Sequence, residues 1–377
     1  MKSLITNGIP LLTPLTGVGR YTYEVAKRID GSEKYSDYYY YGYFAKKLMG
    51  PGEAELLKGL KRVVSSVPLL KSLARRAMKI PARIYAGKRY DLYWEPNFIP
   101  EENIESLKTV VTVHDFSFHG HPEWHPAERI GYFEENFMKK ISRADTIVTV
   151  SEKIKSEAME ILGIPSEKIE VIYNGIDHDL FRIYDEESLR EFRERVSIPE
   201  KFILFVGSIE PRKNLLNLLK AYHRLDEESK REFPLIIAGF KGWENREIMD
   251  EMEKEKEHIA YLGYLDDRDL AMLYSSASIF VYPSLYEGFG IPPVEAMASG
   301  TPVLTSSGTV MEEICADAVI YADPFDIDDI SSKLHLMISD DALRDDLVRR
   351  GVERASLYDW ERCAREHMRL FDRILAG

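Results

Sequence analysis

Cysteine is nearly absent from this chain of 377 residues, which contains only Cys315 and Cys363. Two thiols cannot build the framework of bridges that stabilises small secreted domains, so we expect a reducing compartment and two buried, unbridged thiols. No apolar run approaches the roughly 20 residues that a membrane-spanning helix needs. The first residues have none of the features of a signal peptide. These absences predict a cytoplasmic protein.

An excess of positive charge is also missing, because the formal net charge is -13. A general nucleic-acid binder carries a basic surface, so we expect no nucleic acid as a partner. Apolar residues make up 45% and charged residues 30% of the chain, as is usual in soluble globular proteins. The length fits two domains better than one.

One segment departs from this acidic balance. Residues 56–90 contain no acidic residue and ten cations: Lys58, Lys61, Arg62, Lys71, Arg75, Arg76, Lys79, Arg83, Lys88 and Arg89. Interleaved apolar residues allow segment 58–89 to form a basic amphipathic helix that lies on an anionic membrane surface, at the inner face of the membrane. The alternative is a solvated helix face that offsets the acidity of the rest. Both interpretations stay open.

Short apolar runs alternate with helical patterns over the first half of the chain. Strands are expected at residues 4–6, 38–44, 92–94, 109–113, 146–150 and 169–172, and helices at 21–29, 133–142 and 151–162. Ser151 is the expected N-cap of the last of these helices. Strands that alternate with helices predict an α/β fold with a parallel sheet.

The turn signal at residues 174–177 interrupts this pattern, and we place the inter-domain linker there. A second series follows, with strands expected at 202–206, 235–238, 260–262, 279–282 and 302–304, and helices at 215–223, 267–275, 327–350 and 360–375. We therefore expect domains at 1–174 and 175–360, followed by a helix at 361–377. Two such domains enclose a cleft, and ligands bind at the carboxyl ends of the strands.

The densest cluster of unusual residues follows the strand at 279–282. It contains Glu287-Gly288-Phe289-Gly290 and, eight positions after the first carboxylate, Glu295. Glycines let a ligand approach the backbone, and the N-terminus of the following helix favours an anion such as a diphosphate. Carboxylates accept paired hydrogen bonds from vicinal hydroxyls of sugars and riboses. The pattern predicts a sugar-nucleotide site; the alternative is a glycine-rich turn with two solvated glutamates.

This loop resembles the Glu-x7-Glu signature of retaining glycosyltransferases of family 4, which have the GT-B fold of two Rossmann-like domains. Four further segments match the family's motifs in the same order along nearly the whole chain: residues 17–20, 113–115, 174–177 and 206–214. The final helix crosses back to the N-terminal domain in this family, and the resemblance implies the same here.

The resemblance also implies a role for each matching residue. The sugar of the donor would be held by Glu287, and its ribose by Glu295. The diphosphate would meet the backbone at Gly17, Gly19, Gly207, Ser208, Phe289, Gly290 and Ile291. Arg212 and Lys213 would neutralise the leaving diphosphate, where charge develops in the transition state.

His114 would contact the donor sugar with the help of Asp115. A protein nucleophile is usually not evident in such retaining enzymes, and the leaving phosphate deprotonates the incoming hydroxyl. Glu287 is therefore not given the role of a glycosidase nucleophile. Many family members have Arg where this chain has Ser208. The string Pro211-Arg212-Lys213-Asn214 resembles the mannosyltransferase-like branch, and which of the two cations contacts which phosphate stays open.

Three other patterns suggest metals or cofactors. The histidines 114, 119, 121 and 125 are close in sequence, but Pro122 and Pro126 disfavour one helix that would present them together. The Asp-x-Asp strings at 267–269 and 326–328 are typical of helix starts, where Asp caps free amides. Residues 17–22 lack the third glycine of a dinucleotide fingerprint. We expect no metal and no cofactor.

The sequence thus predicts transfer of a hexose, mannose from GDP-mannose, to a hydroxyl of a glycan or lipid-linked acceptor, with retention of configuration. Two alternatives stay open. One is a sugar-nucleotide isomerase with the same fold, and the other is a subunit that binds the donor without catalysis.

Overall fold

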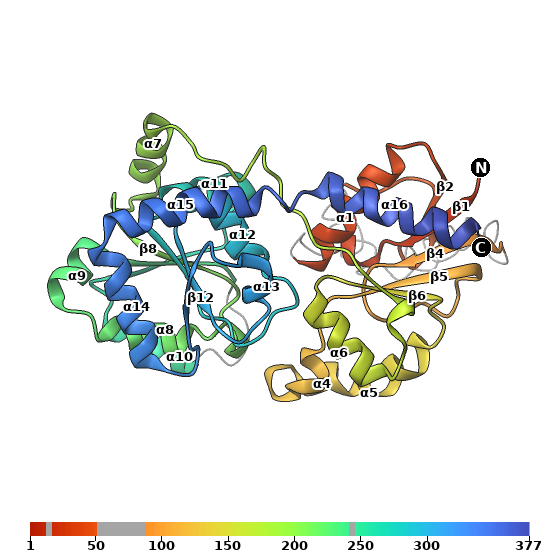
Figure 1. The fold of residues 1–377 in the computed structure, drawn as a ribbon, viewed down its shortest axis with the longest axis horizontal. Helices are drawn as coiled ribbons and strands as arrows, with labels where there is room; N and C mark the ends of the chain where they lie inside the picture. The colour runs from red at the N-terminus through yellow and green to blue at the C-terminus, as the bar shows by residue number, and fades with distance from the viewer. Residues whose placement is uncertain (13–16, 51–87, 241–245, 377) are drawn as a thin grey trace, which may run out of the picture. The chain divides into compact units, whose positions relative to one another are not determined.

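A computed structural model describes residues 1–12, 17–50, 88–240 and 246–376. It contains two compact units (Figure 1). The first comprises Met1–Phe116, Pro126–Gly175 and Trp360–Gly377, and the second Ser117–His125 and Ile176–Asp359. This division differs from the expected domains 1–174 and 175–360 in one segment: Ser117–His125 groups with the second unit and not with the first. Most of the basic segment 58–89 lies outside the described residues.

The first unit is built on a sheet of seven strands in the order β3-β2-β1-β4-β5-β6-β7. Its strands are β1 (Ser3–Asn7), β2 (Ser36–Tyr40), β3 (Phe44–Ala45), β4 (Tyr90–Glu95), β5 (Ser106–Val113), β6 (Thr146–Thr149) and β7 (Ile169–Val171). Its helices are η1 (Ile9–Leu12), α1 (Val18–Asp30), α5 (Ala127–Ile141), α6 (Glu152–Leu162), η3 (Ser166–Lys168) and α16 (Trp360–Ala376). All pairs are parallel except β2 with β3.

That antiparallel pair corrects the strand expected at 38–44. The chain turns back at Gly42, whose φ of 79° is accessible to glycine, and the amide of Tyr41 bonds to the carbonyl of Tyr43 at 2.9 Å. The helix expected at 133–142 starts earlier, at Ala127. Ser151 caps α6 as predicted, since its hydroxyl accepts from the amide of Ile154 at 3.2 Å.

The second unit has a sheet of six parallel strands in the order β10-β9-β8-β11-β12-β13. The strands are β8 (Ile203–Val206), β9 (Leu235–Ala238), β10 (Ile259–Gly263), β11 (Ile279–Tyr282), β12 (Val303–Ser306) and β13 (Ile320–Ala322). The helices are α4 (Ser117–Gly120), η2 (Pro122–Trp124), α7 (Glu186–Val196), η4 (Pro211–Lys213), α8 (Leu215–His223), α9 (Glu227–Glu232), α10 (Arg246–Lys254), α11 (Asp267–Ser276), α12 (Ile291–Ala298), α13 (Met311–Cys315), α14 (Ile327–Ser339) and α15 (Asp341–Ala355).

Aspartates define several helix boundaries in this unit. The single helix expected at 327–350 is wrong, because Asp340 ends α14 and caps α15 through the amide of Leu343 at 2.8 Å. Asp326 caps α14 as predicted. At α11 the cap is Asp266, which accepts from the amide of Asp269 at 2.9 Å, and not Asp267.

Both cysteines are buried and unbridged, as predicted. Burial raises the pKa of the Cys315 thiol to about 12, so this thiol stays protonated and inert at neutral pH. No helix in the described part of the chain is long and apolar enough to cross a bilayer.

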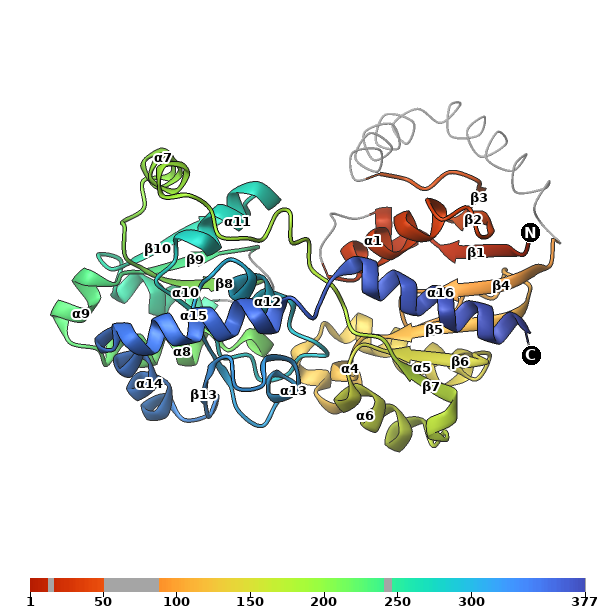
Figure 2. The same cartoon turned by 45° about the horizontal axis from the view of Figure 1, so that its top comes forward.

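In the first unit, α16 and α1 share one core on the same face of the sheet, and both lie across it in Figure 2. A series of linked, buried hydrogen bonds extends through this core. The carbonyl of Cys363 can only accept, so His367 donates to it from Nδ1 at 2.8 Å and accepts at Nε2 from the Tyr21 hydroxyl at 2.7 Å. Thr112 then donates to Tyr21 at 3.0 Å and accepts from the indole of Trp94 at 3.1 Å. Burial lowers the pKa of His367 to about 4, which keeps this imidazole neutral.

The Tyr21 hydroxyl is therefore the link between α1, β5 and α16. We predict that Tyr21→Phe lowers the free energy of unfolding by about 1–3 kcal/mol, because two buried polar groups lose their partner. Urea unfolding followed by tryptophan fluorescence measures the change. Tyr23→Phe on the same helix, where the ring is only partly buried, is the matched control. Equal stability of the two variants would show that the chain of hydrogen bonds contributes nothing.

Candidate active site

The glycine-rich loop between β11 and α12 forms the centre of the candidate site. All four residues of β11 are buried, which fixes the point where the loop begins. Gly290 is the N-cap residue of α12 and has a φ of 92°. A Cβ added there would lie 2.2 Å from Cε of Met311, so only glycine fits. The N-terminus of α12 has no side-chain cap, and its amides and dipole suit an anion.

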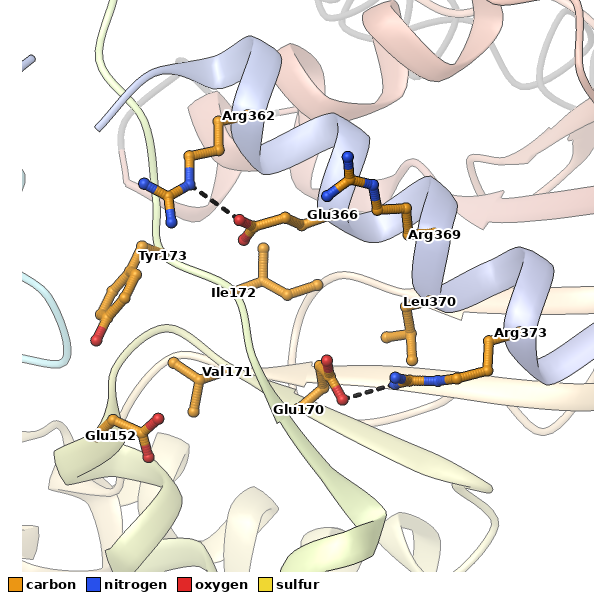
Figure 3. A pocket seen from close by; sticks show the side chains of 10 residues that line it. All are labelled: Glu152, Glu170, Val171, Ile172, Tyr173, Arg362, Glu366, Arg369, Leu370 and Arg373. Carbon is orange, nitrogen blue, oxygen red and sulfur yellow. Dashed lines mark hydrogen bonds and ion pairs between the residues drawn. The ribbon is translucent and has the colours of Figure 1, made fainter. Parts of the chain in front are cut away.

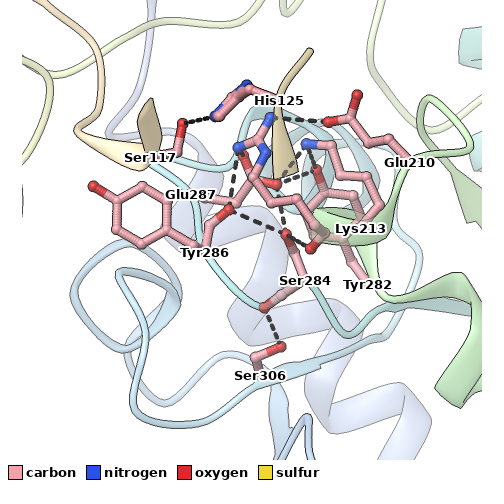
Figure 4. Close-up of polar contacts among 10 residues, drawn as sticks. Ser117, His125, Glu210, Lys213, Tyr282, Ser284, Tyr286, Glu287 and Ser306 are labelled. Carbon is pink, nitrogen blue, oxygen red and sulfur yellow. Dashed lines mark hydrogen bonds and ion pairs between the residues drawn. The ribbon is translucent and has the colours of Figure 1, made fainter. Parts of the chain in front are cut away.

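Glu287 lies in this loop and is only 8% exposed. Its Oε1 accepts from Nζ of Lys213 at 2.5 Å, from the Ser284 hydroxyl at 2.7 Å and from the Tyr282 hydroxyl at 2.8 Å. Its Oε2 accepts from Nη1 of Arg212 at 3.0 Å. Figure 4 shows these groups converging on the carboxylate. The structure thus brings together three of the predicted catalytic residues, which come from loops 75 residues apart.

The charges in this group control each other's protonation. Burial alone would raise the pKa of Glu287, but Arg212 and Lys213 outweigh it and hold the pKa at about 2. Burial lowers the pKa of Lys213, and the neighbouring Arg212 lowers it further, whereas Glu287 opposes both. Nη2 of Arg212 also lies 3.3 Å from Oε1 of Glu210, itself 5% exposed. Two cations and two carboxylates therefore balance, and Glu287 is ionised at neutral pH.

The loop after β8 carries Gly207 and Ser208. The amide of Gly207 bonds to the carbonyl of Ala238 at 3.0 Å. Gly239, the next residue after Ala238, has a φ of 137°, and a Cβ there would lie 2.0 Å from the carbonyl oxygen of Gly207. The backbones of Gly207 and Gly239 are thus in close contact at the carboxyl ends of β8 and β9. Sequence reasoning missed Gly239, although a glycine directly after an apolar strand could have indicated it.

Glu295 lies within α12 and is 6% exposed. Both carboxylates of the signature are therefore buried, which excludes the alternative of two solvated glutamates.

Phe289 is buried and Ile291 partly buried at the start of α12. Sequence reasoning did not identify Tyr282 or Ser284 as partners of Glu287, because a hydroxyl at the end of a strand carries no signal of its own.

The remaining predicted residues belong to the first unit. His114 follows β5, and its Nε2 lies 2.8 Å from the carbonyl oxygen of Pro96. A carbonyl only accepts, so Nε2 carries the proton and Nδ1 presents a lone pair. Burial lowers the pKa of His114, against the opposing effects of Pro96 and Asp115, and the ring is a neutral hydrogen-bond acceptor at Nδ1. The ring of Tyr21 meets that of His114 edge-on, with centroids 4.8 Å apart.

Gly17 is the N-cap residue of α1, with a φ of 47°, and Gly19 is buried in its first turn. They lie on the same helix as Tyr21, so the structure brings the start of α1 toward His114 within the first unit. Asp115 is partly buried beside His114.

No group of three or more histidine, cysteine or acidic side chains is arranged to hold a metal ion among the residues that the structure describes. His121 pairs with Glu123 at 3.2 Å, and His125 with the hydroxyl of Ser117 at 2.9 Å. These histidines therefore have separate partners.

A pocket of about 360 Å³ lies in the first unit between β7 and α16 (Figure 3). None of the predicted site residues lines it. Arg362 pairs with Glu366 at 2.9 Å, and Arg373 with Glu170 at 2.6 Å, so much of its charge is already compensated. It carries no glycine-rich loop and does not provide the chemistry of the Glu287 site.

The buried ion group predicts a pH-dependent contribution to stability. The pKa of Glu287 is depressed in the folded state, to about 2 from its ordinary value of 4.5. The ionised Glu287 therefore stabilises the fold fully at a pH above its pKa in the unfolded protein, and this stabilisation disappears as the pH falls through its pKa in the folded protein. The contribution to the free energy of unfolding amounts to about 3 kcal/mol. We expect Glu287→Gln to unfold more easily than the wild type at pH 7, and the difference to narrow below about pH 4.

Unfolding midpoints in urea at pH 7, 5 and 3 measure this difference. Glu228→Gln, at an exposed glutamate of α9, is the control and should follow the wild type throughout. A difference between wild type and Glu287→Gln that stays constant with pH would contradict the assignment of an ionised, paired carboxylate.

Comparison with known proteins identifies the family. Residues 15–180 match Glycosyltransferase Family 4, and residues 189–354 match Glycosyl transferases group 1. The chain is 33% identical over 367 residues to O-antigen chain mannosyltransferase B of Escherichia coli. This alignment covers 94% of the present chain and 95% of the relative. It is 30% identical over 287 residues to the serotype-specific mannosyltransferase WbdA of Escherichia coli, over 74% of this chain and 35% of that one.

The fold is that of solved glycosyltransferases. Sucrose-phosphate synthase from Thermosynechococcus elongatus superimposes with a TM-score of 0.73 at 18% identity, over the full length of both chains. Two sheets in two units, parallel except for the pair β2 and β3, agree with the predicted GT-B architecture. The chain belongs to glycosyltransferase family 4 and has the GT-B fold.

Proposed function

We propose that the chain transfers mannose from GDP-mannose to a hydroxyl of a growing glycan, free or lipid-linked, with retention of configuration. One observation carries the proposal: Arg212 and Lys213 converge on the buried carboxylate of Glu287, beside the uncapped N-terminus of α12. Cations next to the positive end of a helix dipole suit a diphosphate, and a carboxylate next to them suits sugar hydroxyls. The similarity to an O-antigen chain mannosyltransferase and to a serotype-specific mannosyltransferase supports mannose as the sugar and a glycan as the acceptor.

The diphosphate would approach the cations of η4 and the amides of Phe289, Gly290 and Ile291. As the bond from the sugar to the diphosphate breaks, negative charge grows on the leaving phosphate. Arg212 and Lys213 are already fixed in place before the reaction, so they stabilise that charge without having to reorganise. Glu295 would hold the ribose hydroxyls.

Other aromatic groups fit the remaining parts of the donor. The rings of Phe240 and Tyr264 stack at the carboxyl ends of β9 and β10, with centroids 4.4 Å apart, and are 42% and 55% exposed. Such flat surfaces suit stacking with a nucleobase. In the first unit, the lone pair on Nδ1 of His114 can accept a hydrogen bond from a sugar hydroxyl.

The state of Glu287 supports a mechanism without a protein nucleophile. A carboxylate with a pKa of about 2, bonded to two cations and two hydroxyls, is a weak base and a weak nucleophile. We therefore assign Glu287 to positioning the donor, and we assign deprotonation of the incoming hydroxyl to the leaving phosphate on the same face of the sugar. No metal is needed for charge neutralisation in this scheme.

Acceptor-dependent release of GDP tests this function. We expect GDP to be released from GDP-mannose when a mannose-terminated oligosaccharide is added, and we expect Glu287→Ala to lower this rate at least 100-fold. Thermal unfolding of the variant with and without GDP reports whether the fold and nucleotide binding persist. Conversion of the sugar nucleotide without acceptor would support the isomerase, and GDP binding without any turnover would support the non-catalytic subunit.

A further inference from the structure

Three partly exposed aromatic rings lie together in the second unit. The rings of His121 and Trp124 are stacked, with centroids 3.7 Å apart and an interplanar angle of 12°. The centroid of Tyr286 lies 6.1 Å from that of His121, with the rings tilted by 56°. None of the three side chains is buried, and His121 is 42% exposed. We call these three residues the aromatic platform.

The segment that carries two of these rings is a tightly bonded turn. The amide of His121 bonds to the carbonyl of Ser117 at 2.9 Å, and that of Trp124 to the carbonyl of His121 at 3.1 Å. At the two ends of the segment, the Ser117 hydroxyl and Nε2 of His125 form a hydrogen bond of 2.9 Å. The indole is therefore held in place before any ligand arrives, which reduces the entropy lost on binding.

The third ring belongs to the donor loop. Tyr286 directly precedes Glu287, and its carbonyl accepts from Nη1 of Arg212 at 3.1 Å. Figure 4 shows its ring extending from this loop, with Ser117 and His125, the two ends of the turn, in the same close-up. The platform is thus continuous with the group of residues to which we assign the donor sugar and diphosphate.

Exposed aromatic rings at a site have a chemical preference. Their faces carry partial negative charge, and the C–H bonds of a pyranose ring present partial positive charge on its apolar side. A neutral sugar can therefore stack on such a surface. A charged side chain lies beside the platform: Glu123 pairs with His121 at 3.2 Å and is 63% exposed. Its negative charge disfavours the phosphates of the donor, whereas a neutral glycan meets no repulsion.

We propose that His121, Trp124 and Tyr286 form the subsite on which a terminal neutral sugar ring of the acceptor glycan stacks. The proposal rests on the proposed function, because it takes the neighbouring Glu287 group as the donor site. The stacking holds the acceptor hydroxyl next to the donor sugar, and it contributes to acceptor binding rather than to nucleotide binding.

Steady-state kinetics with GDP-mannose and α-linked mannobiose as acceptor provide the first test. We expect Trp124→Ala to raise the acceptor KM about tenfold, in line with the loss of one stacking contact. The Kd of GDP, measured by calorimetry, should stay unchanged. Trp124→Phe should recover most of the acceptor affinity, because it restores a ring face. Tyr132→Ala, at a 52% exposed ring of α5 in the first unit, is the matched control.

An acceptor KM of Trp124→Ala equal to that of the wild type would overturn the proposal. A loss of GDP affinity in step with acceptor affinity would also overturn it, because the platform would then belong to the donor site or to the fold.

A second measurement needs no turnover and separates this proposal from the proposed function. Saturation-transfer NMR with methyl α-mannoside, methyl α-glucoside and mannobiose reports sugar binding directly. We expect transfer to the C–H protons of one sugar face in the wild type and its loss in Trp124→Ala. If GDP-mannose is not turned over but this result holds, the subsite stands and the donor assignment fails. Absence of saturation transfer to all three sugars would contradict the subsite.

Discussion

The carboxylate of Glu287, held between Arg212 and Lys213, is the interaction on which the rest of the site depends. Removing charges from water is costly, and the cost is offset only when each charge finds close partners of the opposite sign. Glu210, also buried, is the second carboxylate partner of Arg212. This balance requires the loop after β8 and the loop after β11 to meet at the carboxyl edge of the sheet. The adjacency of β8 and β11 in the strand order provides that meeting.

In this group of Arg212, Lys213, Glu210 and Glu287, the opposite charges offset one another. The group nevertheless keeps two cations in place for an anionic substrate. A diphosphate that reaches η4 finds two cations that are already desolvated and oriented, so the free energy of ordering them has been spent during folding. Glycine at 239 and 290 lets the backbone of Gly207 and the side chain of Met311 approach closely, which fixes the shape of the loops around these cations. In the first unit, the hydrogen-bonded core beneath α16 fixes Tyr21 against the ring of His114. The same rule applies in both units: residues assigned to the ligand are held by partners that are buried in the fold.

Two buried strands of the second unit were predicted most closely, for physical reasons, whereas its edge strand β13 was not expected at all. Runs such as 235–238 and 279–282 are buried on both faces and bounded by turn residues, and their bounds were predicted as the structure has them. The hairpin at Tyr41–Tyr43 was missed because one continuous aromatic run hides a glycine turn. The resemblance to the family predicted Arg212 and Lys213, and the residues of the glycine-rich loop predicted Glu287; the structure brings the three together. Tyr282, Ser284 and Gly239 depend on tertiary contacts that no local pattern reports, and the roles assigned to all of these residues stay predictions.

The central claim is that the donor's diphosphate binds the cations that Glu287 holds ready. Calorimetric titration of GDP-mannose into the wild type and Lys213→Ala tests it most directly. The claim predicts that the variant loses affinity by at least tenfold, since a charge-assisted hydrogen bond contributes about 1.5–3 kcal/mol. Lys220→Ala on α8 is the control and should bind as the wild type does. Equal affinity of the wild type and Lys213→Ala would contradict the claim.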